Sequence, residues 1–348
     1  MLRETIDAIR PTSDEHLAAA RERQEQLTKP AGSLGVLEDV GNRLAAIARQ
    51  CPPPVPHRAV VGVFAGDHGV CAQGVTTWPQ EVTVQMLLNM ASGGAAISVL
   101  SDELGASTIL TDVGVASDYP EHPGIRNRKV AKGTADMSAL PAMTREQAEQ
   151  AIEVGIQTAL EAIDGGADIL LTGDMGIGNT TASSALIAVF TGCAVADVAG
   201  RGTGIDDAML AHKTGIIERS IALHGASRDD ALGALAAVGG LEHAAIAGFI
   251  LGAASRGVPV VLDGVIACSS ALVAVALCDA ARGYLIAGHA GIEPGIHAAV
   301  EHLGLSPLVD LGLRLGEGSG AVLALPLVRS AARVLSDMAT FADAGVSH

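Results

Sequence analysis

The sequence predicts an α/β protein with a Rossmann-like, mostly parallel sheet flanked by helices. Short runs of β-branched residues alternate with Ala-rich helical stretches, which is typical of parallel strands joined by crossover helices. Several of these runs lead directly into glycine-rich turns. In such sheets ligands bind beyond the carboxyl ends of the strands. We therefore expect the ligand-binding site to lie where these turns gather. The clearest predicted strands cover residues 59–65, 107–113, 168–172, 258–262 and 284–287.

Both ends of the chain predict a small helical domain. Residues 4–25 are polar and helix-forming, and residues 34–47 repeat apolar side chains at helical spacing. The apolar helical segment 321–335 is expected to pack against them. The proline-rich segment 51–56 can be neither helix nor central strand, and it predicts a connector. We therefore expect a helical domain of residues 1–57 plus 322–348 and a parallel α/β catalytic domain of residues 58–321.

Composition argues against several classes of partner. The net charge is −16, with 38 acidic and 22 basic residues and no Lys/Arg-rich run, so we expect no nucleic-acid partner. Five widely spaced cysteines predict neither a disulfide framework nor a thiolate zinc site, as in a reducing cytoplasm. Residues 1–10 lack the apolar stretch of a signal peptide, and the longest charge-free, strongly apolar stretch is too short to span a bilayer. We expect a cytoplasmic protein with no membrane partner.

The segment 168–185 has the pattern of an anion-binding loop. A strand is predicted to stop at Gly173, and glycines then let the backbone approach a ligand closely. Asn179 and Thr180 offer polar groups where a helix begins. No Gly-Lys-Ser/Thr follows, and Asp174 disfavours a polyphosphate, so the pattern favours a monophosphate ester beside a ribose. Taken alone, these residues also fit a glycine turn with a helix cap.

Two further charged residues are candidates for chemistry. Lys213 stands in a helical stretch otherwise poor in positive charge and could donate to a phosphate, although a solvated helix face is the usual place for a lone lysine. Glu317 lies between glycines after an apolar run, so it can reach a ligand held against the backbone. An apolar setting should raise the pKa of Glu317 and make it a better base near neutrality. A surface turn with an incidental glutamate explains the same segment equally well.

Two other groups of residues admit two interpretations. Trp78 and Met86 could line a flat apolar pocket, or the segment 78–86 could be a core helix with the same residues buried. Asp67, His68, Asp263 and His289 stand at or near predicted strand ends and could suggest a metal cluster. Metal sites usually place His and carboxylates at tight local spacing, which does not recur here, so we expect no metal.

Five segments together resemble one family, nicotinate-nucleotide:dimethylbenzimidazole phosphoribosyltransferase. The segments occur in family order across nearly the whole chain, which makes the resemblance far more specific than any single motif. They are Lys-Pro-Ala-Gly-Ser-Leu-Gly (29–35), Ala-Gly-Asp-His-Gly-Val (65–70), Gly-Asp-Met-Gly-Ile-Gly-Asn-Thr-Thr (173–181), Val-Val-Leu-Asp-Gly (260–264) and Arg-Leu-Gly-Glu-Gly-Ser-Gly (314–320).

The resemblance implies a homodimer without metal or cofactor that moves 5-phosphoribose from nicotinate mononucleotide to 5,6-dimethylbenzimidazole, giving α-ribazole 5′-phosphate and nicotinate. It implies Glu317 as the catalytic base, and the loop 176–180 with Lys213 as the phosphate site. Many relatives carry Glu where this chain has Asp174, whose shorter side chain should sit farther from the ligand. The full set of expected substrate-binding residues is Gly176, Ile177, Gly178, Asn179, Thr180, Lys213, Asp174, Asp263, Trp78, Met86 and Leu315.

The chemistry of that transfer is consistent with the residues. Nicotinate leaves from a pyridinium glycoside, and its departure neutralises positive charge without a metal. An imidazole nitrogen attacks the opposite face of C1′ with inversion, and a carboxylate takes the proton from the other ring nitrogen. The alternatives are the same transfer to adenine, benzimidazole or a phenol, a metal-dependent hydrolase built on Asp67, His68, Asp263 and His289, or a nucleotide-sensing module.

Overall fold

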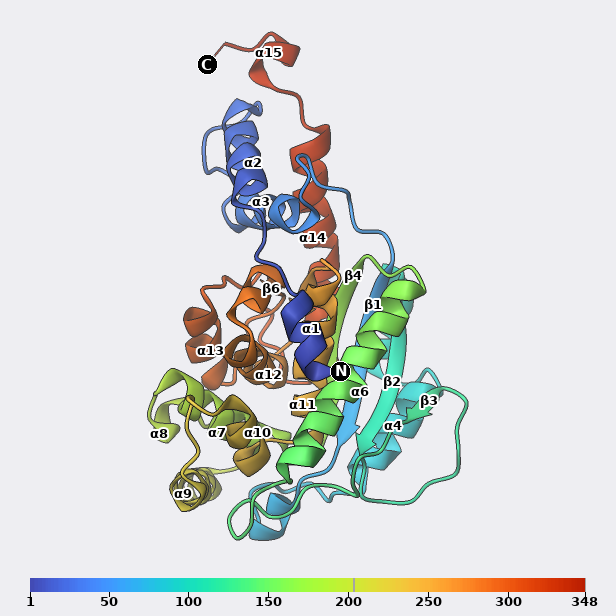
Figure 1. Ribbon diagram of the computed structural model, residues 1–348, viewed down its shortest axis with the longest axis vertical. Coiled ribbons are helices and arrows are strands. Elements are labelled where there is room, and N and C mark those ends of the chain that lie inside the picture. Colours follow the sequence, from blue (N-terminus) through green and yellow to red (C-terminus); the bar gives the residue numbers. More distant parts are fainter. Residues whose placement is uncertain (203, 348) are drawn as a thin grey trace.

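The computed structural model describes residues 1–202 and 204–347 and contains a parallel sheet between layers of helices (Figure 1). The described strands are β1 (Ala59–Gly66), β2 (Ala106–Gly114), β3 (Ile125–Asn127), β4 (Ile169–Met175), β5 (Val260–Leu262) and β6 (Leu285–Ala287), in the order β3-β2-β1-β4-β5-β6. Every pairing between neighbouring strands is parallel, so the predicted Rossmann-like fold class is confirmed.

The five predicted strands are present, with two differences. The sequence did not predict β3, which has only three residues. The strand predicted at 168–172 was expected to stop at Gly173. That end was wrong, because the corresponding strand β4 continues to Met175. Gly173 pairs with Val63 of β1, and Asp174 with Phe64, so the ladder carries the carboxylate to the edge of the sheet.

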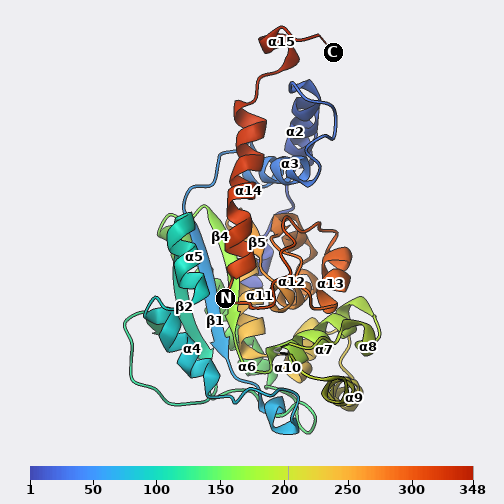
Figure 2. The ribbon, with the colours of Figure 1, turned by 180° about the vertical axis from the view of Figure 1, so that it is seen from behind.

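Helices cover both faces of the sheet. On one face α6 and α11 pack on the strands, with α12 beside them, and on the other face lie α4, α5 and α14 (Figure 2). The helices are α1 (Leu2–Ala8), α2 (Asp14–Gln26), α3 (Val36–Ala48), α4 (Val82–Ala91), α5 (Ala96–Leu104), α6 (Arg145–Asp164), α7 (Asn179–Thr191), α8 (Val195–Val198), α9 (Asp207–His224), α10 (Ala231–Val238), α11 (Leu241–Ser255), α12 (Val265–Leu277), α13 (Gly295–Leu303), α14 (Ser319–Asp337) and α15 (Phe341–Ala344).

Helices α2 and α3 meet the C-terminal part of α14 in a small helical unit above the sheet (Figure 1). Helices α2 and α3 pack together and against α14, around a core of Ala20, Leu27, Ala45 and Leu335. The region 4–25 is two helices rather than one, because Pro11 lies in the segment between α1 and α2. Helix α1 packs on α6 and α11. We propose that residues 1–57 and 322–348 form one small domain, of which α1 and part of α14 pack against the α/β domain.

Two helical segments are long and apolar enough to cross a membrane by length and composition alone. The first, 82–104, is interrupted between α4 and α5. The second is α14, which lies against β4, β5 and α3. More than half of its apolar stretch is buried. A core helix of a water-soluble protein passes the same test, so neither segment by itself indicates a membrane.

Helices α6 and α11 pack closely together, and each has a glycine at the point of contact. A Cβ at Gly155 of α6 would lie 1.8 Å from the carbonyl oxygen of Ala245, and one at Gly248 of α11 would lie 1.9 Å from that of Ile152. Backbone atoms cannot move aside as the end of a flexible side chain can. The two helices therefore depend on glycine at both positions to pack this closely.

We expect Gly248→Ala to lower the free energy of unfolding by about 3 kcal/mol, since overpacking a crowded contact forces the backbone apart. Gly215→Ala in α9 is the matched control, because its Cβ would meet only the end of the Arg219 side chain, at 3.4 Å. That variant should gain about 0.5–1 kcal/mol through the helix propensity of alanine. Urea denaturation measures both, and equal stability of Gly248→Ala and the wild type would contradict the expected clash.

The strand order positions the site. From β1 the chain moves outward to β2 and β3, and from β4 it moves the other way to β5 and β6. The carboxyl ends of β1 and β4 thus flank the topological switch point, where open α/β sheets bind their ligands. As the sequence predicted, the segments that follow β1, β4, β5 and β6 meet at this edge.

Candidate active site

The loop between β4 and α7 is held from both sides. The backbone N–H of Ile177 donates to Thr83 Oγ1 of α4 at 3.1 Å, and Cys71 Sγ donates to the Ile177 carbonyl at 3.2 Å. Gly178 has a φ of +91°, and a Cβ there would lie 2.5 Å from Cys71 Sγ, so glycine is required for this close approach. The loop presents the amino-terminal N–H groups of α7, which suit an anion.

Lys213 of α9 reaches under this loop. Its Nζ donates to Thr180 Oγ1 at 2.9 Å and to the Gly200 carbonyl at 3.0 Å, and the residue is only 1% exposed. The solvated helix face that is usual for a lone lysine is therefore wrong for this residue. Burial lowers the pKa of Lys213 to about 8, against an opposing effect of the Glu293 charge. The fold thus places a buried lysine beside the loop 176–180.

Asp174 and Asp263 are buried carboxylates with different surroundings. Asp174 Oδ2 accepts a hydrogen bond from Asn179 Nδ2 at 2.9 Å, while its Oδ1 has no partner among the described residues. Burial, reinforced by the negative charges of Asp263 and Glu242, raises the pKa of Asp174 well above its ordinary value.

Asp263 serves the turn that carries Glu317. Its Oδ1 accepts the N–H groups of Gly320 and Ala321 at 2.6 and 3.0 Å, and its Oδ2 accepts that of Gly318 at 3.2 Å. Burial raises the pKa of Asp263 to about 6, although these hydrogen bonds favour the charged form. Asp263 therefore holds the start of α14 in place.

Glu317 is buried between β4 and the start of α5. Its φ of +66° is rare for a residue other than glycine, and its Oε2 accepts the N–H of Ile97 at 3.2 Å. A Cβ on Gly173 of β4 would lie 2.6 Å from the Glu317 carbonyl oxygen. Burial raises the pKa of Glu317, with the Ile97 hydrogen bond acting in the opposite direction. The direction matches the expectation from the sequence, and a surface turn is excluded because the residue is 3% exposed.

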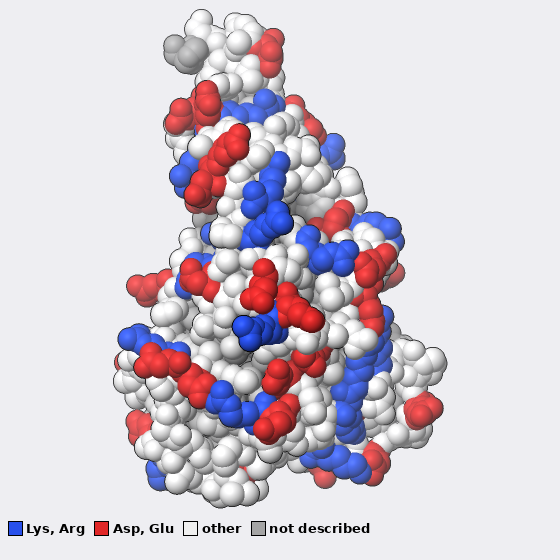
Figure 3. Space-filling model, viewed as in Figure 1, with Lys and Arg blue, Asp and Glu red and all other residues white. Residues whose placement is uncertain are grey.

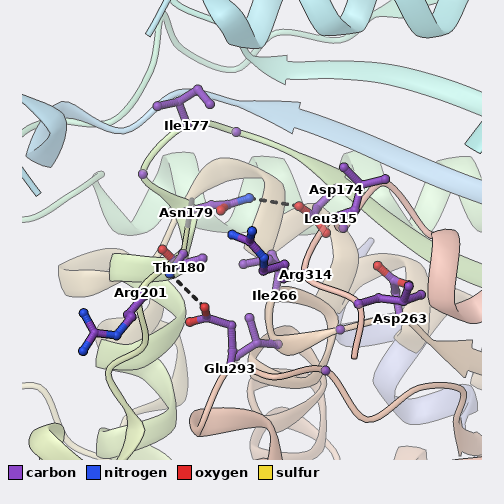
Figure 4. Close-up of a pocket in the computed structure, with 18 of the residues that line it drawn as sticks. Asp174, Ile177, Asn179, Thr180, Arg201, Asp263, Ile266, Glu293, Arg314 and Leu315 are labelled. Carbon is purple, nitrogen blue, oxygen red and sulfur yellow. Dashed lines mark hydrogen bonds between the residues drawn. The ribbon is translucent and has the colours of Figure 1, made fainter. Parts of the chain in front are cut away.

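A cavity opens at the switch point, lined by most of the expected residues (Figure 4). Glu317, Trp78 and Met86 are not among the described residues that line it. The neighbours of Glu317, Leu315 and Gly316, do line it, and a Cβ on Gly316 would lie 3.1 Å from Asp174 Oδ2. The expected residues in the lining are Asp174, Gly176, Ile177, Gly178, Asn179, Thr180, Lys213, Asp263 and Leu315.

Trp78 and Met86 lie on the α4 side of the loop. Trp78 precedes α4 and is 49% exposed, so it does not belong to a core helix. Met86 is within α4 and packs, partly buried, in the same apolar cluster as Met175 at the end of β4. The core-helix interpretation therefore fits only the residues from Val82 onward, because Trp78 precedes the helix and is exposed.

Sequence reasoning missed three charged residues of the cavity. Arg201, Glu293 and Arg314 line it, and Figure 4 shows Glu293 and Arg314 facing the same space as Asn179 and Thr180. Arg314 stood in a quoted motif without an assigned role. Glu293 follows β6 by several residues, and nothing in its local pattern indicated burial.

The four residues considered for a metal do not form one cluster among the described residues. His68 instead joins Glu242 and His243, all three buried. Glu242 Oε1 lies 2.5 Å from His68 Nε2 and 2.9 Å from His243 Nδ1, and His243 Nε2 is hydrogen-bonded to Ser183 Oγ at 2.8 Å. Ligands placed about 2.0–2.2 Å from a zinc ion would be farther apart than these atoms. These three residues form a buried cluster of ion pairs and hydrogen bonds beneath α7.

The His68–Glu242 pair should make stability depend on pH. Burial alone would lower the pKa of His68, but the Glu242 carboxylate outweighs it and the pKa is raised. Burial alone would raise the pKa of Glu242, but the two histidines hold it well below its ordinary value. The stability that His68 contributes is present below about pH 6.5 and is lost as pH rises through the folded pKa.

We therefore expect the free energy of unfolding to fall as pH rises above about 6.5, and to fall less in His68→Gln, which cannot titrate. Denaturant titrations of both proteins at several pH values measure this. Parallel pH profiles for the two proteins would show that His68 is not protonated in the folded state.

The Rossmann strand order, the glycine-rich loop at the switch point and the buried lysine are typical of a nucleotide-binding α/β enzyme. A family model described as phosphoribosyltransferase matches residues 9–346. Nicotinate-nucleotide–dimethylbenzimidazole phosphoribosyltransferases of Chloroflexus aggregans and Salinispora tropica are 55% and 52% identical over the whole chain, and the matches cover 98% and 99% of those proteins. The chain belongs to this family of pentosyltransferases.

A solved structure agrees with this assignment. The crystal structure of the nicotinate-nucleotide–dimethylbenzimidazole phosphoribosyltransferase from Thermus thermophilus superposes with a TM-score of 0.90 at 47% identity. The match covers 97% of this chain and 99% of that one. The likeness therefore extends over the sheet, the flanking helices and the helical unit together.

Proposed function

We propose that this enzyme transfers the 5-phosphoribosyl group of nicotinate mononucleotide to 5,6-dimethylbenzimidazole, with release of nicotinate and formation of α-ribazole 5′-phosphate. The names of its relatives supply both substrates. One observation carries the proposal: a cavity at the switch point brings an anion-binding loop with a buried lysine against the turn that bears Glu317. Asn179 of the loop donates a hydrogen bond to Asp174 at the end of β4, and Gly316 of the turn lies next to the same carboxylate.

The loop 176–180 and Lys213 bind the 5′-phosphate in this proposal. The N–H groups at the start of α7 and the adjacent ammonium complement a dianion, and Asn179 is held in place by Asp174. Asp174 and Asp263 line the space beyond, where the ribose would lie. Asp263 acts on the ligand chiefly through the turn that it fixes.

Glu317 is the general base of the proposed reaction. The acceptor base would sit between Leu315 and the α4 side, where Trp78 and Met86 offer apolar surface. Leu315 and Trp78 are 56% and 49% exposed, and such exposure of large apolar side chains suits a flat aromatic ligand. One imidazole nitrogen attacks C1′ as the bond to nicotinate breaks, and the carboxylate of Glu317 takes the proton from the other nitrogen.

We further propose that the enzyme is a cytoplasmic homodimer that needs no metal, nucleic acid or membrane. On the face in Figure 3 acidic and basic side chains are interspersed, which together with the net charge of −16 does not favour a polyanion. Exposed Val99, Leu223 and Leu311 offer apolar surface for a second copy of the chain.

Incubation of the purified protein with nicotinate mononucleotide and a panel of bases, followed by mass analysis of the products, tests this function. We expect nicotinate release that requires a base, with the dimethylbenzimidazole riboside formed in preference to those of benzimidazole, adenine or phenol. Nicotinate release at the same rate without any base would indicate a hydrolase instead.

A further inference from the structure

Glu293 is a buried acid of the cavity that the proposed reaction does not use. It follows β6, is 9% exposed, and its Oε1 accepts the backbone N–H of Gly202 at 2.8 Å. Its Oε2 has no hydrogen-bond partner in the part of the chain that the structure describes. Glu293 lines the cavity, so Oε2 can accept a hydrogen bond there from water or from a bound ligand.

The surrounding backbone is shaped around this carboxylate. A Cβ on Gly200 would lie 1.8 Å from Glu293 Oε2, so any side chain at this position would expel the carboxylate from its place. A Cβ on Gly202 would lie 2.9 Å from Thr180 Oγ1. The glycines at 200 and 202 thus bring one stretch of backbone against both Glu293 and the anion-binding loop, and Figure 4 shows Glu293 beside Thr180.

The position next to the phosphate site limits what Oε2 can bind. Lys213 donates to both Thr180 and Gly200, so the phosphate and Glu293 would share the same neighbours. A phosphate oxygen would repel the carboxylate, whereas a hydroxyl group would donate to it. The hydroxyls on C2′ and C3′ are the donors that a ribose 5-phosphate carries near its phosphate. Carboxylates take this role toward ribose in other Rossmann-type folds.

We propose that Glu293 accepts a hydrogen bond through Oε2 from a ribose hydroxyl of the nucleotide, and so selects ribosyl over deoxyribosyl donors. This inference rests on the proposed phosphoribosyl transfer. It assigns Glu293 to substrate selection, while the tie from Oε1 to Gly202 holds the carboxylate in position.

The test compares wild type, Glu293→Gln and the control Glu301→Gln with nicotinate mononucleotide and its 2′-deoxy and 3′-deoxy analogues. Glu301 is an exposed acid of α13 outside the cavity lining. We expect wild type to lose about 10- to 100-fold in kcat/KM on one of the analogues, the range for a hydrogen bond to a charged group. Glu293→Gln should lose about as much on the full substrate, and little more on that analogue. Glu301→Gln should behave as wild type.

Three outcomes would overturn the inference. Wild type could use both deoxy analogues as well as the full substrate, a result that needs no variant and does not depend on folding. Glu293→Gln could lower KM for the nucleotide, which would make the carboxylate a repulsive neighbour of the phosphate. The variant could also lose equally on all donors, as expected for a structural tie. Absence of any phosphoribosyl transfer by wild type would instead contradict the proposed function itself.

Discussion

Glu317→Gln is expected to lower kcat by about 10²–10⁴-fold, the range for loss of a general base. The substitution keeps the shape of the side chain, and the amide oxygen can still accept the Ile97 N–H that the carboxylate accepts. Nucleotide binding should be retained, because the loop 176–180 and Lys213 are untouched. Single-turnover assays with nicotinate mononucleotide and dimethylbenzimidazole, with calorimetric titration of the nucleotide, separate the two effects.

Stability provides an independent check on this variant. Because burial raises the pKa of Glu317, the folded protein disfavours its charged form near neutrality, and the glutamine variant should unfold no more easily than wild type. Glu103→Gln on the exposed side of α5 is the matched control and should retain full activity. Full turnover by Glu317→Gln would remove this residue from the mechanism.

Lys213→Met is expected to lower kcat/KM for nicotinate mononucleotide by about 10²-fold or more, since removal of one partner of a buried charged group costs several kcal/mol. Methionine fills similar space but leaves Thr180 Oγ1 and the Gly200 carbonyl without their donor. The loss should appear mainly in KM, because the proposed binding mode places the lysine at the phosphate and not at the reacting carbon. Initial rates over a range of nucleotide concentrations measure it.

The pH dependence of wild type should agree with this assignment. Because burial lowers the pKa of Lys213 to about 8, the free enzyme loses this cation as pH rises above that value, and the apparent affinity for the nucleotide should fall. Lys132→Met, at an exposed ion pair with Asp118, is the control for loss of one positive charge. An unchanged KM in Lys213→Met would place the phosphate elsewhere.

Patterns local in sequence predicted much of the fold. Alternating β-branched and Ala-rich runs indicated five strands of the parallel sheet, because side-chain periodicity reports directly on which face of an element is buried. The end of β4 was misplaced, because its last residues are strand only through pairing with β1. The three-residue β3 has no periodicity to detect, and it exists because β2 offers an edge.

The candidate site divides in the same way. Glycines and polar residues at 176–180 indicated an anion site by local chemistry alone, and the apolar setting of Glu317 indicated the direction of its pKa shift. The burial of Lys213, the capping role of Asp263 and the presence of Glu293 in the cavity could not be predicted. Each depends on a partner far away in the chain, such as Thr180 for Lys213 and Gly202 for Glu293.

Short segments of the chain were enough to establish the class of fold, the family and the residues at the ends of the strands, because periodicity, turn chemistry and ordered motifs are local properties. Three other properties became known only from the packed molecule: which charges are buried, which carboxylates accept backbone N–H groups and which side chains face the cavity. Desolvation and hydrogen bonding depend on every atom that surrounds a group, and those atoms come together only when distant segments pack.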